Sequence, residues 1–400
     1  MKNNKVVTLI TIIAVIAIAA AFFGVNHLID AYVNQQRATQ SGNQVSVSGQ
    51  AAVGQAVSPA NGMIMATMDS PDESGVCGEN LEWYYKDGVL VITGTGEMDE
   101  YINSAGSAPW YGLWNQIGLG ILDEGVTNIG DAAFKDCVNM TEIVLPSSLK
   151  NIGDSAFENC SSLKEVVLPD SVIHIGYGAF ENCSALREIA IPNSVATIGG
   201  YAFSGCISLR KIELSYSMTR INERTFSGCC NLQHLELPDS ITSIGEKAFR
   251  GCNSITEIKL PDYLTRIDNC LFENCTGLME IDLPDTINRI GDNAFASCTA
   301  LTEITIPDSV MSIGDSAFYN CSNLTEITIP DSVMSIGDCA FKDCDSLTEL
   351  TIPDSVTSMG DGIFMHCRNV TIYYSGNVLD SYINRNSGDW NSENIVWVRQ

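Results

Sequence analysis

The sequence predicts a repeat solenoid, with a parallel β-sheet along one side of the coil and short turns or 3₁₀/helical segments along the other. The first observation behind this prediction is a phenylalanine that recurs every 23 residues without insertion, followed three residues later by a cysteine. The second is a short apolar and polar alternation at one fixed place in each copy, typical of a half-buried strand. Copies of this length cannot bury an apolar face alone and must stack on one another. The repeating phenylalanines are Phe134, Phe157, Phe180, Phe203, Phe226, Phe249, Phe272, Phe295, Phe318, Phe341 and Phe364.

The strand of each repeat is well illustrated by the copy at residues 301–323. Leu301, Ile304 and Ile306 alternate with polar residues, so one side of the strand faces the core and the other faces solvent. Pro307 follows, and because proline has no amide hydrogen to donate, it belongs at the end of a strand. Each repeat therefore contributes one short strand to a sheet that runs the length of the array.

The second half of each repeat reverses the direction of the chain. In the same copy, Gly314 permits a tight bend, and Ala317-Phe318 is expected to form a single helical or 3₁₀ turn. The coil thus returns to the start of the next strand, with phenylalanine in the interior.

The pattern Leu-x-x-Ile-x-Ile-x-x-Ser resembles the leucine-rich repeat. Its fuller form, with Pro-Asp-Ser-Val, Ile-Gly-Asp, Ala-Phe and Cys, looks like the BspA-like subclass of bacterial surface proteins and covers residues 117–375. The resemblance implies a right-handed leucine-rich-repeat coil and an extracellular, non-enzymatic protein that adheres to host or neighbouring-cell proteins. It also implies that a hydroxyl column bonds the turn backbone. This column comprises Ser148, Ser171, Ser194, Ser217, Ser240, Thr286, Ser309, Ser332 and Ser355.

The N-terminal residues 1–25 carry Lys2 and Lys5 and then an apolar run from Val6 to Val25, long enough to cross a bilayer. A cleaved signal peptide and an uncleaved anchor both remain open, and the length of the run favours the anchor. Either segment exports the rest of the chain. We therefore expect a cell-surface protein held by its N-terminus, or alternatively a secreted one.

Residues 26–76 have the polar composition of a flexible tether. Residues 77–116 are expected to cap the array, because two β-rich runs flank Lys86-Asp87-Gly88 and predict a hairpin. The repeats occupy 117–375, and the amphipathic residues 376–400 are expected to form a C-terminal cap.

Eleven of the 15 cysteines form the column that follows phenylalanine. Stacked strands are about 4.8 Å apart, which exceeds the usual Cβ separation of about 3.8 Å in a disulfide. A column of buried free thiols is therefore predicted. The redox state of Cys77, Cys230, Cys270 and Cys339, which lie outside the column, stays open.

The formal charge of −27 excludes a nucleic-acid surface, since phosphates would be repelled. The sequence shows no catalytic motif and no metal-ligand spacing, so no enzyme activity, cofactor or metal is predicted. Columns of Asp and Glu suit turn chemistry and solubility, with calcium bridging between stacked carboxylates as a less favoured alternative.

The outward residues of the central repeats depart from the pattern of their neighbours, and such positions are free to serve a partner. We hypothesise a charged protein-binding site on the sheet face of the repeats that span residues 187–266. Its residues are Arg187, Arg210, Lys211, Glu213, Tyr216, His234, Glu236, Lys259 and Arg266. The predicted function is adhesion or binding of an extracellular protein, with a cell-envelope spacer or scaffold lacking a specific ligand as the alternative.

Overall fold

The computed structural model describes residues 71–101, 108–375, 382 and 395–400. The chain divides into two compact units, one comprising Met1–Ser74 and Tyr84–Asp87 and the other comprising Gly75–Trp83 and Gly88–Gln400. The second unit contains all the repeats. The predicted N-terminal segment 1–25 lies outside the described residues, as does all but 71–76 of the predicted tether. Within the described ranges, no helix has the length and apolar character needed to cross a membrane.

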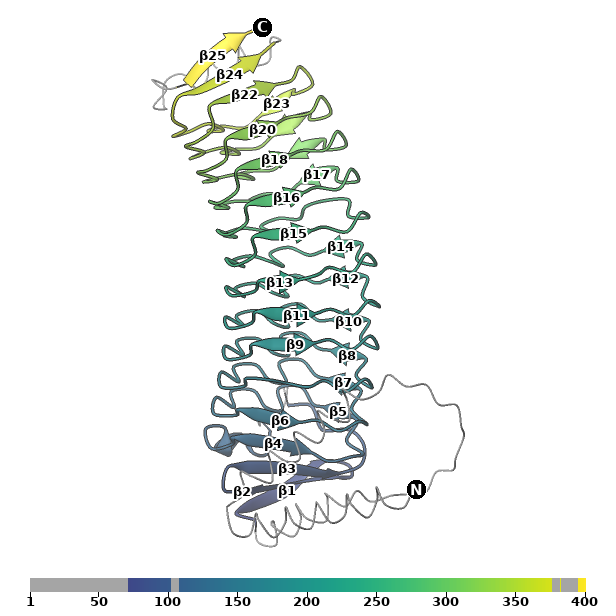
Figure 1. The fold of residues 1–400 in the computed structure, drawn as a ribbon. Helices are drawn as coiled ribbons and strands as arrows, with labels where there is room; N and C mark the ends of the chain where they lie inside the picture. The colour runs from purple at the N-terminus through teal and green to yellow at the C-terminus, as the bar shows by residue number, and fades with distance from the viewer. Residues whose placement is uncertain (1–70, 102–107, 376–381, 383–394) are drawn as a thin grey trace, which may run out of the picture. The chain divides into compact units, whose positions relative to one another are not determined.

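The repeats stack as about eleven turns of a parallel β-solenoid, which confirms the predicted fold class (Figure 1). One side is the long-strand ladder, formed by the strand predicted in each repeat. Its members in the repeats are β6 (Glu142–Val144), β9 (Glu188–Ala190), β11 (Lys211–Glu213), β13 (His234–Leu235), β15 (Glu257–Lys259), β16 (Glu280–Asp282), β18 (Glu303–Thr305), β20 (Glu326–Thr328), β22 (Glu349–Ile352) and β24 (Val370–Tyr374).

A second ladder of two-residue strands was not predicted. This short-strand ladder forms where the chain bends after the proline, and its strands also pair in parallel, as in Ser312↔Ser335 and Ile313↔Ile336. Its members are β5 (Asn128–Ile129), β7 (Asn151–Ile152), β8 (His174–Ile175), β10 (Thr197–Ile198), β12 (Arg220–Ile221), β14 (Ser243–Ile244), β17 (Arg289–Ile290), β19 (Ser312–Ile313), β21 (Ser335–Ile336) and β23 (Ser358–Met359).

The N-terminal end carries the predicted hairpin strands. The first sheet has the order β1-β2-β3-β4-β6. Its additional members are β1 (Glu73–Gly78), β2 (Leu81–Lys86), β3 (Val89–Gly94) and β4 (Leu119–Leu122), and a 3₁₀ helix, η1 (Tyr111–Leu113), precedes β4. Asp87 and Gly88 both have positive φ (48° and 86°), the geometry of the predicted tight turn. β1 begins at Glu73, inside the segment expected to be a tether.

The core is a continuous stack of the repeating phenylalanines, with neighbouring ring centroids 5.1–5.8 Å apart. Trp110 stacks on Phe134 at 5.7 Å, and its indole nitrogen donates a hydrogen bond to the Ala133 carbonyl. At the other end, Trp397 of β25 (Ile395–Arg399) contacts Phe364 edge to face at 6.1 Å. A tryptophan thus covers each end of the phenylalanine stack.

The predicted single turn at Ala317-Phe318 is present, closed by the hydrogen bond that Tyr319 N donates to Ser316 O at 3.0 Å, and this side of the coil also carries a third ladder. The N–H groups of Ser316 and Phe318 donate to Asp338 and Ala340 in the next coil, at 2.7 and 2.8 Å. Ser316 has a φ of 54°, in the left-handed region, so the segment forms successive turns rather than a helix. We call this side of the coil the turn ladder.

All 15 cysteines are free, which confirms the predicted buried thiol column. Each column thiol from Cys160 onward donates to the carbonyl of the phenylalanine 26 residues earlier, as Cys321 Sγ does to Phe295 O at 3.1 Å. The column hydroxyls have a similar role, since Ser332 Oγ donates to the Val310 carbonyl at 2.7 Å. Both columns therefore satisfy backbone oxygens that the ladders leave without a strand partner.

The aspartates that follow the bend glycine also cross-link coils. Asp315 Oδ1 accepts the Asp338 N–H at 2.8 Å, and Asp292 Oδ1 accepts the Asp315 N–H at 3.1 Å. This arrangement is the turn chemistry favoured from the sequence. Within the described part of the chain, no group of three or more His, Cys, Asp or Glu side chains could hold a metal ion.

Substituting Asp315→Ala is expected to lower the free energy of unfolding by about 1 kcal/mol, because the Asp338 N–H loses its acceptor. Asp315→Asn keeps an oxygen at the same place and should lose much less. Urea denaturation of the two variants measures the difference. Equal losses for alanine and asparagine would contradict the role of this oxygen.

Candidate protein-binding surface

The predicted site residues that lie on the long-strand ladder come together in register. Lys211 is the Cα partner of Glu188 in β9 and of His234 in β13, and all three side chains are exposed. The residues between them, Ile189 and Ile212, point inward and are buried. The alternation predicted from sequence therefore presents the charged residues of neighbouring repeats side by side.

Lys211 lies within a group of carboxylates. Its ammonium contacts Glu213 Oε1 at 2.5 Å, and the hydrogen bond with Glu213 raises the pKa of Lys211 above its ordinary value, with smaller contributions from Glu188 and Glu236. Both side chains of the Lys211–Glu213 pair are at least half exposed, so the pair adds little to stability. The charges are thus available to a partner.

Arg187 and Arg210 lie just before this group, at the entry to β9 and β11. Both side chains are exposed, and the Arg210 N–H donates to the Arg187 carbonyl at 2.8 Å, so the two residues are adjacent. We call the set Arg187, Arg210, Lys211, Glu213, His234 and Glu236 the charged strand surface. It has a basic edge at the start of the strands and acidic groups towards their ends.

Three of the predicted residues lie apart from this group. Lys259 is on the same ladder, but β15 pairs with β16, where Asp282 is its partner, and not with β13. Tyr216 lies in the turn after β11 and is 72% exposed. Arg266 lies at the position of the short-strand ladder, where it contacts Asp268 Oδ2 at 3.1 Å. The sequence did not reveal that two ladders, rather than one, carry these residues.

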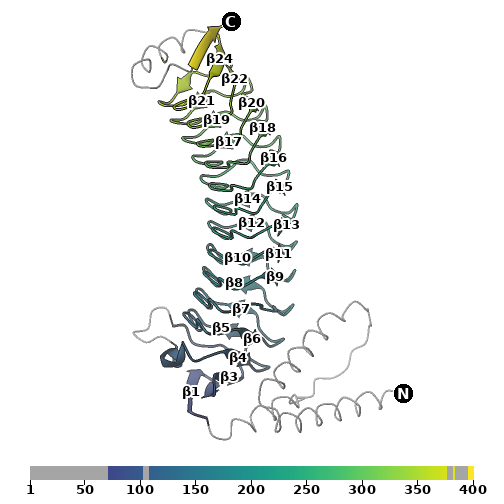
Figure 2. The ribbon, with the colours of Figure 1, turned by 60° about the vertical axis from the view of Figure 1, so that its left-hand side comes forward.

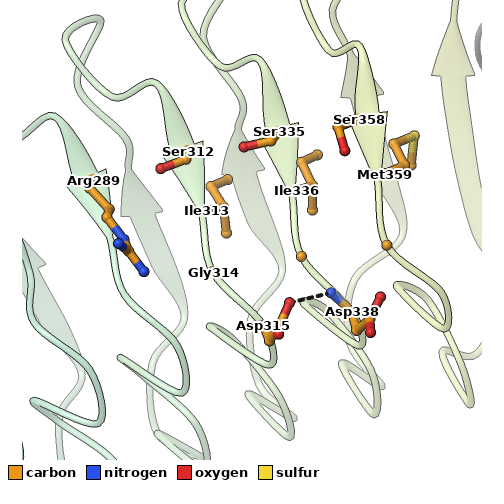
Figure 3. Close-up of a pocket in the computed structure, with 12 residues that line it drawn as sticks. Arg289, Ser312, Ile313, Gly314, Asp315, Ser335, Ile336, Asp338, Ser358 and Met359 are labelled. Carbon is orange, nitrogen blue, oxygen red and sulfur yellow. Dashed lines mark hydrogen bonds between the residues drawn. The ribbon is translucent and has the colours of Figure 1, made fainter.

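A hollow of about 430 Å³ on the short-strand ladder was missed from the sequence (Figure 3). Arg289 lies at one end, and the hydroxyl-bearing residues Ser312, Ser335 and Ser358 follow one another across it, with Met359 at the other end (Figure 3). The signal in the sequence is the change from arginine to serine in one column. Because the hollow is open and its serines simply repeat, we assign it no ligand.

A second feature missed from the sequence is an aromatic stack on the turn side. The rings of Tyr177 and Tyr201 are 5.0 Å apart, and the Arg224 guanidinium lies 5.0 Å from the Tyr201 centroid. Burial, followed by the neighbouring Tyr201, raises the pKa of Tyr177 to about 12. A Cβ at Gly200 would lie 3.1 Å from the Glu223 carbonyl oxygen, so glycine allows the coil that carries Glu223 to approach closely. These residues occupy coils in which the aspartate column is interrupted.

The sequence matches the BspA type leucine rich repeat region, in six copies, over residues 127–256 and 242–371. The chain belongs to this family of BspA-type leucine-rich repeat proteins. Solenoids of this family are typically non-enzymatic scaffolds for protein interaction, and the BspA-type repeat here has the geometry of such a scaffold. No curated protein matches the chain.

Two solved structures illustrate the relationship. A leucine rich cell surface protein from Faecalibacterium prausnitzii is 25% identical, with a TM-score of 0.53, and the match covers 82% of this chain and 95% of that one. A leucine-rich repeat protein from Eubacterium ventriosum is also 25% identical, with a TM-score of 0.50, over 72% of this chain and 95% of the other. The BspA-type array is thus similar to bacterial leucine-rich repeat proteins over most of its length.

Proposed function

We propose that this chain is an extracellular adhesion or protein-binding module that contacts its partner through the charged strand surface. The apolar run from Val6 to Val25 would tether it to the membrane with the repeats outside the cell. The family relationship supports protein binding, and the similarity to a cell surface protein supports the location. Adhesion and tethering are parts of the proposal.

The observation that carries the proposal is the contrast between the constant inward positions of the long strands and their divergent outward positions. The inward column keeps isoleucine or leucine at Ile189, Ile212 and Leu235, whereas the outward column changes from Glu188 to Lys211 and His234. Because outward side chains contribute little to packing, the fold does not dictate this change. A binding partner of complementary charge accounts for the change of charge in the outward column.

A two-stage experiment tests this function. The full chain is first used to capture extracellular proteins, and the affinity of a purified captured protein is then measured for the unaltered chain and for its variants. Lys211→Glu is expected to weaken binding by about tenfold or more, because rim and surface charges set complementarity. The thermal unfolding temperature should stay nearly constant, since the Lys211 side chain is exposed.

Lys150→Glu is the matched control, because Lys150 is exposed and precedes the short-strand ladder rather than the long-strand ladder. It makes the same change in charge on another side of the coil and should leave affinity within about twofold. Equal affinity of all three proteins would reject the charged strand surface. Absence of any reproducible partner would favour the alternative, a cell-envelope spacer without a specific ligand.

A further inference from the structure

The bend glycine of each repeat allows two coils to approach closely. In the short-strand ladder, Gly314 N donates to Ile290 O at 2.9 Å, and Gly291 N donates to Ile267 O at 2.8 Å. A Cβ at Gly314 would lie 2.6 Å from the carbonyl carbon of Gly291 in the preceding coil. Because real Cβ atoms do not approach backbone this closely, another residue at this position must separate the coils.

Two repeats carry a different residue at the bend, Asn222 and Asp268. At Asn222 the side-chain amide replaces the missing backbone bond, donating to Ile198 O at 2.6 Å. At Asp268 the carboxylate turns to its own coil, accepting from Arg266 Nε and from Asn269 N, both at 3.1 Å. Strand pairing in the short-strand ladder stops at both places, leaving β12 and β14 as a separate pair.

In the described repeats, the junction before Asp268 is where both strand ladders stop together. The long-strand ladder also divides between β6 and β9, between β16 and β18 and between β20 and β22, but the short strands stay paired there. At Asn222, β9 and β11 remain paired, whereas at Asp268 the sheet that ends with β13 is separate from the sheet that begins with β15. Leu235 and Leu237 are partly exposed on the β13 side. Figures 1 and 2 both show β13 further from β15 than from β11.

The turn ladder continues across the same junction. Phe249 N donates to Leu271 O at 3.1 Å, Gly251 N donates to Glu273 O at 2.8 Å, and the Arg250 guanidinium bonds Glu273 at 2.7 Å. The rings of Phe249 and Phe272 are still stacked, but their planes differ by 13°, more than in any other phenylalanine pair of the stack. The two coils at this junction are therefore hydrogen-bonded along the turn ladder and unpaired along both strand ladders.

We propose that this junction is a hinge built into the solenoid. The coils up to residue 254 and those from residue 255 rotate relative to each other about the turn ladder, which opens and closes the two strand ladders. Asp268 creates the hinge by keeping the coils apart at the bend. The hinge stands on backbone geometry and does not depend on the proposed function.

The hinge also divides the residues of the predicted binding site. His234 and Glu236 lie before the junction and Lys259 lies after it, so rotation changes the spacing between these charges. This role in adjusting the site to a partner rests on the proposed function. If the charged strand surface binds no partner, the role in adjusting the site is rejected, but the hinge itself is not.

Native-state hydrogen exchange on the full chain tests the hinge directly. The amides of Thr256, Thr265 and Asp268 are expected to exchange about tenfold or more faster than the equivalent amides of Met279, Asn288 and Gly291, which donate to carbonyls of the preceding coil at 2.8–2.9 Å. Asp268→Gly should remove this difference, because the backbone bond to Ile244 can then form. The Asn222 junction is an internal control, since its paired long strands should keep the amides at 210–213 protected.

Gly291→Asp is the matched variant, because it places the same side chain at the next junction. It should transfer fast exchange to the amides of Met279, Asn288 and residue 291. Equal protection at the two junctions of the unaltered chain would overturn the hinge. So would an exchange pattern that Asp268→Gly leaves unchanged.

Discussion

Raising the pH to about 10 is expected to unfold the array, because the column thiols must stay protonated to remain buried. Burial raises the pKa of Cys321 from 9.0 to about 12, and burial likewise raises that of Cys275 to about 12. Between pH 9.0 and about pH 12 the folded chain keeps its thiol protons, whereas the unfolded chain releases them. The unfolded chain then binds fewer protons, so the free energy of unfolding falls as the pH rises.

The size of this effect follows from the number of thiols. The stabilisation is fully present below pH 9.0 and is lost progressively towards pH 12. At pH 10 each column thiol accounts for a loss of about 1.4 kcal/mol, and the column accounts for about 15 kcal/mol in all. A loss of this size matches the total stability of an ordinary domain, about 5–15 kcal/mol.

Thiolate absorbance in the ultraviolet and circular dichroism, recorded together during the titration, measure this transition. The two signals should change in one cooperative step. A salt concentration of about 1 M screens the repulsion among the acidic side chains, which would otherwise add to the effect. Replacing Cys321 and Cys344 by alanine should reduce the dependence of unfolding free energy on pH by two protons. Gradual appearance of thiolate in a chain that stays folded would contradict the prediction.

Replacing Phe295 by alanine is expected to destabilise the chain by about 3–5 kcal/mol, because it removes one ring from the middle of the stack. Phe295 is fully buried and stacks on Phe272 and Phe318 at 5.5 and 5.4 Å. A coil in a solenoid is stabilised by its two neighbours. The cavity therefore weakens both junctions of one coil at once, and urea denaturation measures the loss.

Met311→Ala is the matched control for this substitution. Met311 is close in sequence to Phe295 but is 51% exposed, so its truncation should change the free energy of unfolding by less than about 0.5 kcal/mol. A loss of less than about 1 kcal/mol for Phe295→Ala would show that the phenylalanine stack does not hold the coils together.

One column of residues with left-handed backbone conformation shows how backbone geometry selects the residue type. The column that holds Asn159, Asn182, Gly205 and Asn320 has positive φ throughout, between 58° and 74°. Asparagine and glycine are the residues that adopt this conformation readily, so the Asn-Cys-Ser pattern there follows from backbone geometry and the buried cysteine column. The residue types at this register therefore follow from the turn conformation that the stacked coils require.

The charged strand surface was predictable only in part. Alternation within the strand identified Lys211 and Glu213 as outward residues of one strand, and the 23-residue register placed His234 beside Lys211. The position of Arg266 could not be obtained in this way, because a two-residue strand is too short to produce a visible alternation. The separation of Lys259 from His234 could not be obtained from the repeat either, because both residues keep the 23-residue register while β13 and β15 lie in separate sheets.

The sequence alone determined the period, the buried phenylalanine and cysteine columns and the long strand of each repeat, because a residue type repeated at constant register has one environment in every coil. The tertiary structure alone decided how the coils meet: alternate N–H groups of the turn ladder bond the next coil, and both strand ladders stop at the junction before Asp268. These features depend on distances between backbones from neighbouring coils. Such distances become defined only when one coil is stacked against the next.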